Sequence, residues 1–295
     1  MTTLAIYTFA GASVVLAGLV LSGRRIRRPW LVVWGVAPVI LVYALNPGFR
    51  VSSFHSFMHG GIVYRILGGD VPPGDPLVAG YAVHYPWGTH LVAAAISLAL
   101  RTTPFYALAV LNVAALAAVL VIIYRISCLL TEDRLANILS VMVACYAVTP
   151  VIPEMLRPLP AGFPTEIRGI PIIHKFITVN NLPVGLVFFL LALHAAMRLY
   201  APGGIRRAHA IRLLVWTSAC GFFYPAFLPG LVGGAVLGYL VGLFLWLRNR
   251  TGPGPARGLL PLAAVGVGAA VLLPYLMATG SGTVASMEVL SLIHI

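Results

Sequence analysis

Seven acidic side chains in a chain of 295 residues limit the places where acid–base chemistry can occur. Two of them, Asp70 and Asp75, share one segment with Arg65. A carboxylate can remove the proton of an attacking hydroxyl group, and an arginine can hold the charge of a departing phosphate. Asp75 and Asp70 are therefore candidates for a general base, and Arg65 is a candidate for binding a phosphate.

A second segment, residues 153–181, offers the same two kinds of side chain. Its candidate acids and phosphate-binding cations are Glu154, Arg157, Glu166, Arg168 and Lys175. Each acid also has a structural alternative, because an arginine lies close to it in the sequence and would form an ion pair. We expect the two segments to form one groove, with an acid of the first within about 12 Å of a cation of the second, a span guided by pocket sizes.

The choice between the two aspartates depends on how firmly the backbone holds each of them. Pro73 and Pro76 restrict the chain around Asp75, whereas Asp70 follows two glycines that leave its backbone loose. A catalytic group needs a fixed geometry, so Asp75 is favoured narrowly. The structural alternative for both is a turn, since aspartate before proline is a common turn former.

Histidine and aromatic side chains surround these acids in the first segment. The candidates for substrate contact are His55, His84, Tyr85 and Trp87. His55 and His59 are four residues apart, so both would point to one side of a helix. No glutamate follows His55, so the zinc motif HExxH is absent. No residue is assigned as a metal ligand, and the aromatic side chains also suit a membrane interface.

The elements that position these residues are membrane helices. The chain is 60% hydrophobic and 9% charged, with a mean hydropathy of +0.97. Soluble domains are about 45–50% apolar and about 25% charged, so the composition excludes a soluble enzyme, a disordered chain and a disulfide-framed secreted module. The net charge of +12 comes from basic residues in short runs between apolar segments, which favours the positive-inside rule over nucleic-acid binding.

Eight apolar segments are expected to cross the bilayer, in an all-α polytopic membrane protein. They lie at 4–22, 30–46, 104–127, 136–152, 182–200, 210–226, 229–247 and 258–277. Residues 88–101 are also apolar, but as a helix they reach only about 21 Å across a core of about 30 Å. If they do not cross, 13 of the 19 basic residues face the cytoplasm, as the positive-inside rule requires. We therefore expect a juxtamembrane or re-entrant helix there, with both termini outside.

This topology predicts one membrane domain over residues 1–289, with outer loops at 47–103 and 153–181. The last six residues, 290–295, read LSLIHI and resemble a translated sequencing adapter. We expect them to be a non-native tail on a chain that naturally continues. The dominance of arginine, with Lys175 the one lysine, indicates a GC-rich bacterial gene and a bacterial inner membrane.

Residues 45–130 resemble the first outer loop of GT-C-type membrane glycosyltransferases. The similarity lies in a histidine-bearing amphipathic helix, then GGDVPPGDP, then GYAVHYPW, then a short apolar helix. The resemblance implies an all-helical enzyme that transfers sugars from polyprenyl-phosphate carriers, on the outer face, to a glycan, lipid or protein acceptor. It implies an acidic base or metal ligand in this loop, which leaves a divalent metal open. Relatives carry an aspartate where Ser52 and Ser53 stand here.

Two alternatives come from other classes of protein. A membrane transporter or lipid flippase would place ionisable groups or a broken helix near the bilayer midplane. The main polar residues within the predicted membrane segments are Asn112 and His194, so the lack of midplane charge favours an enzyme on the outer face. The serines at 52 and 53 would instead suit a non-catalytic membrane scaffold.

Overall fold

The computed structural model describes residues 36–37, 40, 54–81, 83, 85–146, 181–200, 206–249 and 255–280. Within these ranges the structure is helical and contains no strand, so the predicted all-α class is confirmed for this part of the chain. The elements are α3 (Phe54–Leu67), α4 (Gly88–Leu100), α5 (Pro104–Leu130), α6 (Arg134–Tyr146), α9 (Leu182–Tyr200), α10 (Arg206–Phe223), the short 3₁₀ helix η2 (Pro225–Phe227), α11 (Leu228–Asn249), α12 (Pro255–Ala270) and α13 (Leu273–Gly280).

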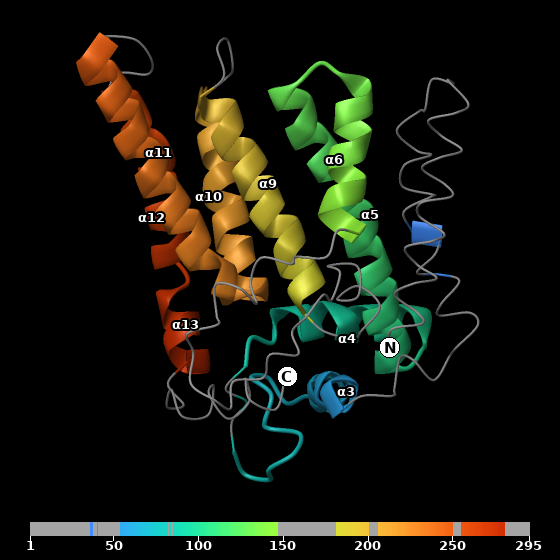
Figure 1. Cartoon of the computed structure of the whole chain (residues 1–295). Coiled ribbons are helices and arrows are strands. Elements are labelled where there is room, and N and C mark those ends of the chain that lie inside the picture. Colours follow the sequence, from blue (N-terminus) through green and yellow to red (C-terminus); the bar gives the residue numbers. More distant parts are fainter. Residues whose placement is uncertain are drawn as a thin grey trace, which may run out of the picture.

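The long helices run side by side, and two short helices lie across one end of them. Figure 1 shows α5, α6, α9, α10, α11 and α12 as a bundle, with α3 and α4 below it. Helix α9 packs against both α5 and α10, and α12 packs against α10 and α11. The loop that joins α3 to α4 hangs from the same end of the bundle (Figure 1). The first predicted outer segment is therefore gathered at one end, which we call the α4 end.

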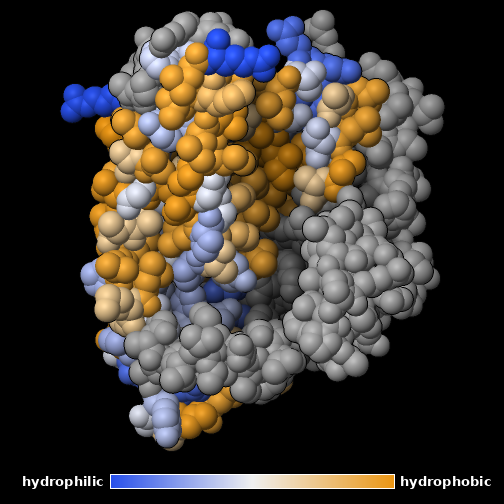
Figure 2. Space-filling view, turned by 60° about the vertical axis from the view of Figure 1, so that its left-hand side comes forward, coloured by the Kyte–Doolittle hydropathy of each residue, from blue (hydrophilic) through white to orange (hydrophobic). Residues whose placement is uncertain are grey.

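Three helical segments of the described residues are long and apolar enough to span a membrane: Pro104–Leu130, Leu182–Tyr200 and Pro225–Arg248. A fourth is obtained if α12 and α13, which meet at a bend of 47°, are counted as one broken span. Figure 2 shows the broad hydrophobic surface of this bundle. The residues thus form membrane-type helices, as the composition predicts.

The predicted count of eight crossings is not supported by the described residues. The described part of helix α6 has 13 residues, fewer than the about 20 that a crossing needs. Helix α10 has 18 residues but carries three arginines among them, and each charge is costly in the bilayer core. The predicted segments 4–22 and 30–46, apart from Val36, Ala37 and Ile40, lie outside the described residues, as do both termini.

The short helix α4 lies across the end of the bundle, as the count of basic residues predicts (Figure 1). It is an apolar helix of 13 residues and is not among the segments of spanning length. Its first residue presses on α10: a Cβ added at Gly88 would lie 2.6 Å from Phe222 Cδ1 and 2.8 Å from the Phe222 carbonyl oxygen. At its other end Arg101 has a left-handed backbone (φ 49°), and its N–H bonds back into the last turn.

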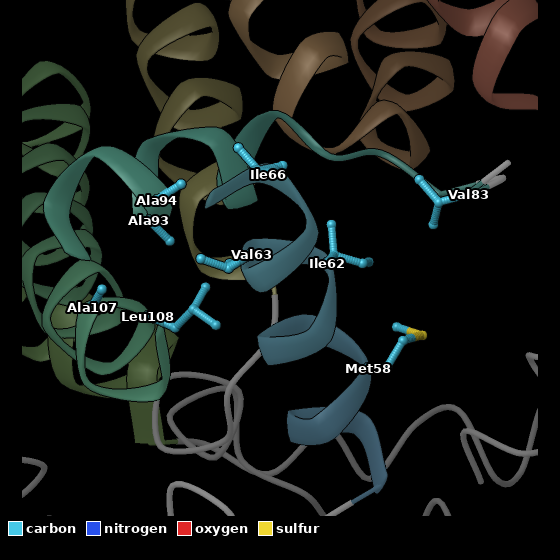
Figure 3. Packing of buried hydrophobic residues seen from close by; sticks show 9 residues of the cluster. All are labelled: Met58, Ile62, Val63, Ile66, Val83, Ala93, Ala94, Ala107 and Leu108. Carbon is cyan, nitrogen blue, oxygen red and sulfur yellow. The ribbon is translucent and has the colours of Figure 1, made fainter. Parts of the chain in front are cut away.

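Buried aliphatic side chains hold α3 and α4 against the beginning of α5. Figure 3 shows this cluster, in which Val63 of α3 lies beside Ala93 of α4 and Leu108 of α5, and to which Ile62 of α3 also belongs. Ile62, Val63, Ala93 and Leu108 have no solvent exposure. Helix α3 ends at Leu67, just before Gly68 and Gly69, and Gly69 has φ +91°. The two short helices are therefore packed onto the bundle rather than loosely attached.

We expect Gly185→Ala to lower the free energy of unfolding by about 1–3 kcal/mol, the usual range for overpacking. Gly185 lies in the first turn of α9, and an added Cβ would collide with Tyr224 Cβ and come within 3.4 Å of Tyr224 Cα. Denaturant titration of the protein in micelles measures the change. Gly234→Ala is the matched control, since nothing lies within 4 Å of that position. Equal losses in both variants would contradict the close approach of α9 to Tyr224.

Candidate functional site

The loop between α3 and α4 brings Arg65, Asp70 and Asp75 together, and Asp70 has a structural task there. Its carboxylate oxygen Oδ2 lies 3.8 Å from Arg65 Nη1, and both side chains are 43% exposed. The same oxygen accepts a hydrogen bond of 2.9 Å from the Gly74 N–H. Asp70 therefore closes the turn that follows the two glycines, as its structural alternative predicts.

Asp75 is held in place by backbone hydrogen bonds, both to its carboxylate and from its own N–H group. Its Oδ1 accepts hydrogen bonds from the N–H groups of Leu77 (2.7 Å) and Val78 (3.1 Å), and its own N–H donates to the Tyr81 carbonyl at 2.7 Å. Arg65 Nη2 donates to the Asp75 carbonyl oxygen at 3.4 Å. The side chain is half-buried. A fixed aspartate beside an arginine suits both a turn and a catalytic base, so both interpretations stay open.

A second polar group is buried beneath this loop: His59, Tyr85, His90 and Asn181, which we call the histidine cluster. His59 Nδ1 and His90 Nε2 are 2.6 Å apart, so one imidazole donates a hydrogen bond to the other. Their rings are stacked with centroids 4.9 Å apart. The Tyr85 ring meets both edge-on, at 5.5 and 6.0 Å. Both histidines are fully buried, and polar groups in that position need partners.

The histidine cluster connects the two predicted outer loops. Tyr85 of the first loop donates a hydrogen bond of 2.8 Å from its hydroxyl to Asn181 Oδ1, 96 residues away at the start of α9. Burial raises the pKa of the Tyr85 hydroxyl above its usual value. The hydroxyl therefore stays protonated and can donate this hydrogen bond. Asn181 is 1% exposed, and its Nδ2 has no hydrogen-bond partner among the described residues.

Trp87 has a packing role next to the histidine cluster. Its ring contacts Phe222 and Tyr275 edge-on, with centroids 6.1 and 5.8 Å apart. The Trp87 backbone N–H donates to the Tyr275 hydroxyl at 3.1 Å, and that hydroxyl donates to the Phe222 carbonyl at 3.1 Å. Trp87 thus fixes the start of α4 to α10 and α13, and its contact with a substrate stays a prediction.

The remaining predicted site residues cannot be placed. His84, the His55 side chain and the whole second group, Glu154, Arg157, Glu166, Arg168 and Lys175, lie outside the described residues. The predicted distance between an acid of the first loop and a cation of the second therefore stays a prediction. Among the residues that the structure describes, no three His, Cys, Asp or Glu side chains gather where a metal ion could bind.

The sequence did not point to the pairing of His59 with His90, nor to Asn181. The two histidines are 31 residues apart and come from different helices, and no spacing rule relates them. The spacing of His55 and His59 does not indicate the contact of His59 with His90, which comes from another helix. The sequence offered one signal for a histidine contact, namely that several histidines lie in the same predicted outer loop of a membrane protein.

We expect Tyr85→Phe to lower the free energy of unfolding by about 1–3 kcal/mol, the usual cost of a buried polar group left without its partner. The substitution keeps the ring beside both imidazoles and removes the hydroxyl that Asn181 accepts from. Thermal denaturation in micelles measures the loss. Tyr81→Phe is the control, because the Tyr81 side chain is 66% exposed. An unchanged melting temperature in Tyr85→Phe would show that this hydrogen bond does not tie the two loops together.

Comparison with known proteins adds no family to these observations. No family model matches the chain, and no curated protein or solved structure shows significant similarity to it. An inference about function therefore depends on the side chains at the α4 end and on the local resemblance of residues 45–130.

Proposed function

We propose that the chain is the membrane part of a GT-C-type glycosyltransferase, which moves a sugar from a polyprenyl-phosphate carrier to an acceptor hydroxyl at the α4 end. The observation that carries the proposal is the hydrogen bond between Tyr85 and Asn181. It brings the first outer loop, with its fixed aspartates and Arg65, to the end of the second predicted loop. The acids of one loop and the cations of the other would then share a site.

In the proposed reaction the Asp75 carboxylate accepts the proton of the acceptor hydroxyl. The hydroxyl oxygen attacks the anomeric carbon of the sugar. The bond between that carbon and the phosphate oxygen of the carrier breaks, and its electron pair stays with the departing phosphate. Arg65, 3.4 Å from the Asp75 carbonyl, is close enough to the base to hold the phosphate as it leaves. Arg157, Arg168 and Lys175 would add charge from the second loop, with Asp70, Glu154 or Glu166 as alternative bases.

The bilayer would supply the carrier to this site from the side. Leu98 and Leu100 near the end of α4 are 68% and 58% exposed, and such side chains suit the acyl region of a membrane. A polyprenyl chain is an apolar polymer that stays in that region while its phosphate sits at the surface. The transverse helix α4 would therefore lie between the lipid part of the carrier and the loop that carries the acids.

Sugar transfer in membranes tests the proposal. Bacterial inner-membrane vesicles that contain the chain are supplied with defined polyprenyl-phosphate sugars, and product formation is followed with a labelled sugar. Transfer that depends on the chain supports the enzyme. Movement of the labelled carrier between leaflets without product would favour a transporter or lipid flippase. Absence of both activities, in protein that is folded and inserted, would favour the scaffold suggested by Ser52 and Ser53.

A further inference from the structure

Basic side chains from three helices gather at the end of the bundle opposite α4. They are Arg125 on α5, His194 and Arg198 on α9, and His209 and Arg212 on α10, which we call the basic cluster. The other four side chains all lie within electrostatic range of the His194 imidazole, and Arg198 and Arg212 both lie within range of His209. Helix α9 packs between α5 and α10, so the five side chains converge on one place.

The basic cluster lies at a depth where lipid phosphates are found. Arg198 is two residues from the end of α9, Arg125 is five from the end of α5, and Arg212 is six from the start of α10. At a rise of about 1.5 Å per residue, all three lie within about 9 Å of a helix end. The polar headgroup region on each side of a bilayer is about 5–8 Å thick. These charges therefore lie at the boundary between headgroups and acyl chains.

Acidic side chains do not neutralise the basic cluster within the described part of the chain. None of the three arginines has a carboxylate within ion-pair distance there. The nearest described acids in sequence to Arg125 are Glu132 and Asp133, and Asp133 accepts hydrogen bonds from the N–H groups at the start of α6. Like charges brought together in this way repel one another, and an anion placed among them would remove that cost.

We propose that the basic cluster binds the phosphate of an anionic phospholipid headgroup. The guanidinium group presents a planar fork of donors that matches a phosphate, and basic pockets between membrane helices suit anionic headgroups. Because the cluster is at the opposite end from Asp75 and Arg65, it is separate from the proposed transfer site. Figure 2 shows hydrophilic residues bordering the hydrophobic band at the top of the bundle.

The neighbouring side chains favour a lipid over a soluble phosphate. Leu193 beside His194 is 37% exposed, and Ile211 and Val215 on either side of Arg212 are 54% and 45% exposed. These aliphatic groups would lie along the acyl chains of the molecule whose phosphate the arginines hold. A free phosphate ion has no part that would contact them.

Lipid binding to the whole chain in neutral micelles tests the proposal. Fluorescent phosphatidylglycerol is titrated, and phosphatidylcholine serves as the zwitterionic comparison. We expect saturable binding of phosphatidylglycerol alone. Each of Arg125→Gln, Arg198→Gln and Arg212→Gln should weaken it about fivefold, because one basic side chain near a membrane surface contributes roughly that factor. Arg198→Lys keeps the charge without the fork and should fall between the wild type and Arg198→Gln.

Arg248→Gln is the matched control, since Arg248 lies in the last turn of α11 and is not among the charges that act on His194. It should change the affinity by less than twofold. Equal weakening by Arg248→Gln and Arg198→Gln would overturn the proposal in favour of diffuse surface charge. Inorganic phosphate is added as a competitor at the concentration at which the lipid binds. If phosphate then displaces the lipid completely, the proposal is overturned in favour of a soluble anion. Melting temperatures of all variants show that each is folded.

Discussion

Replacing Asp75 by asparagine is expected to lower the rate of sugar transfer at least a hundredfold while leaving the yield of folded protein unchanged. Asparagine keeps a side-chain oxygen that can accept from the N–H groups of Leu77 and Val78, so the turn persists. It cannot take a proton from the acceptor hydroxyl, and general-base catalysis contributes about 10²–10⁴-fold. The measurement is the initial rate with a defined polyprenyl-phosphate sugar in membranes.

Asp133→Asn is a matched control for this experiment. Asp133 Oδ1 also accepts from two backbone N–H groups, those of Leu135 (2.8 Å) and Ala136 (3.4 Å), but it lies at the start of α6, away from the transfer site. It should retain the normal rate. Near-normal transfer by Asp75→Asn would move the role of base to Asp70 or to the second loop, whereas loss of rate together with poor yield would identify Asp75 as a turn residue.

The second large effect is expected in the histidine cluster. His59→Ala should lower the free energy of unfolding by about 3 kcal/mol or more, because it removes a fully buried ring and the hydrogen bond to His90 Nε2. Large-to-small substitutions in a core typically cost about 2–5 kcal/mol, and loss of a buried polar partner adds to that. Denaturant titration in micelles gives the value.

A double-mutant cycle with His90→Ala separates the cavity from the hydrogen bond. Contacting residues show coupling energies of about 0.5–3 kcal/mol, so the double variant should lose less than the sum of the two single variants. Tyr64→Ala on the same helix is the control, since Tyr64 is 52% exposed. Additive losses from His59→Ala and His90→Ala would show that the 2.6 Å contact contributes nothing to stability.

The parts of the fold that the sequence predicts are those in which the signal is local. Length alone separates α4 from a spanning helix, and the distribution of arginines supports its position. The end of α3 at Gly68 and Gly69, and the turn at Asp75, follow from residues with strong backbone preferences. The predicted break between segments 210–226 and 229–247 falls at the short helix η2, between α10 and α11, which run in opposite directions (Figure 1).

The site was harder to predict because its contacts join distant parts of the chain. The predicted topology places His59, His90 and Tyr85 in one loop, but it does not indicate that the two imidazoles are in contact. Asn181 accepts its hydrogen bond from Tyr85, which is 96 residues away in the sequence, and no local pattern indicates that contact. The basic cluster was hidden for a related reason: its arginines were counted as markers of sidedness, without regard to the helix packing that brings them together.

The transverse position of α4 also affects the shape that the protein presents to its membrane. A helix of 13 residues that lies flat covers roughly 200 Å², from a length of about 20 Å and a width of about 10 Å, in one leaflet only. The spanning helices take equal area from both leaflets. Within the described part of the chain, α4 therefore adds area at the α4 end alone, and a membrane whose leaflet on that side is convex would accommodate the added area best. Its distribution between flat and curved regions of a cell envelope would follow from that asymmetry.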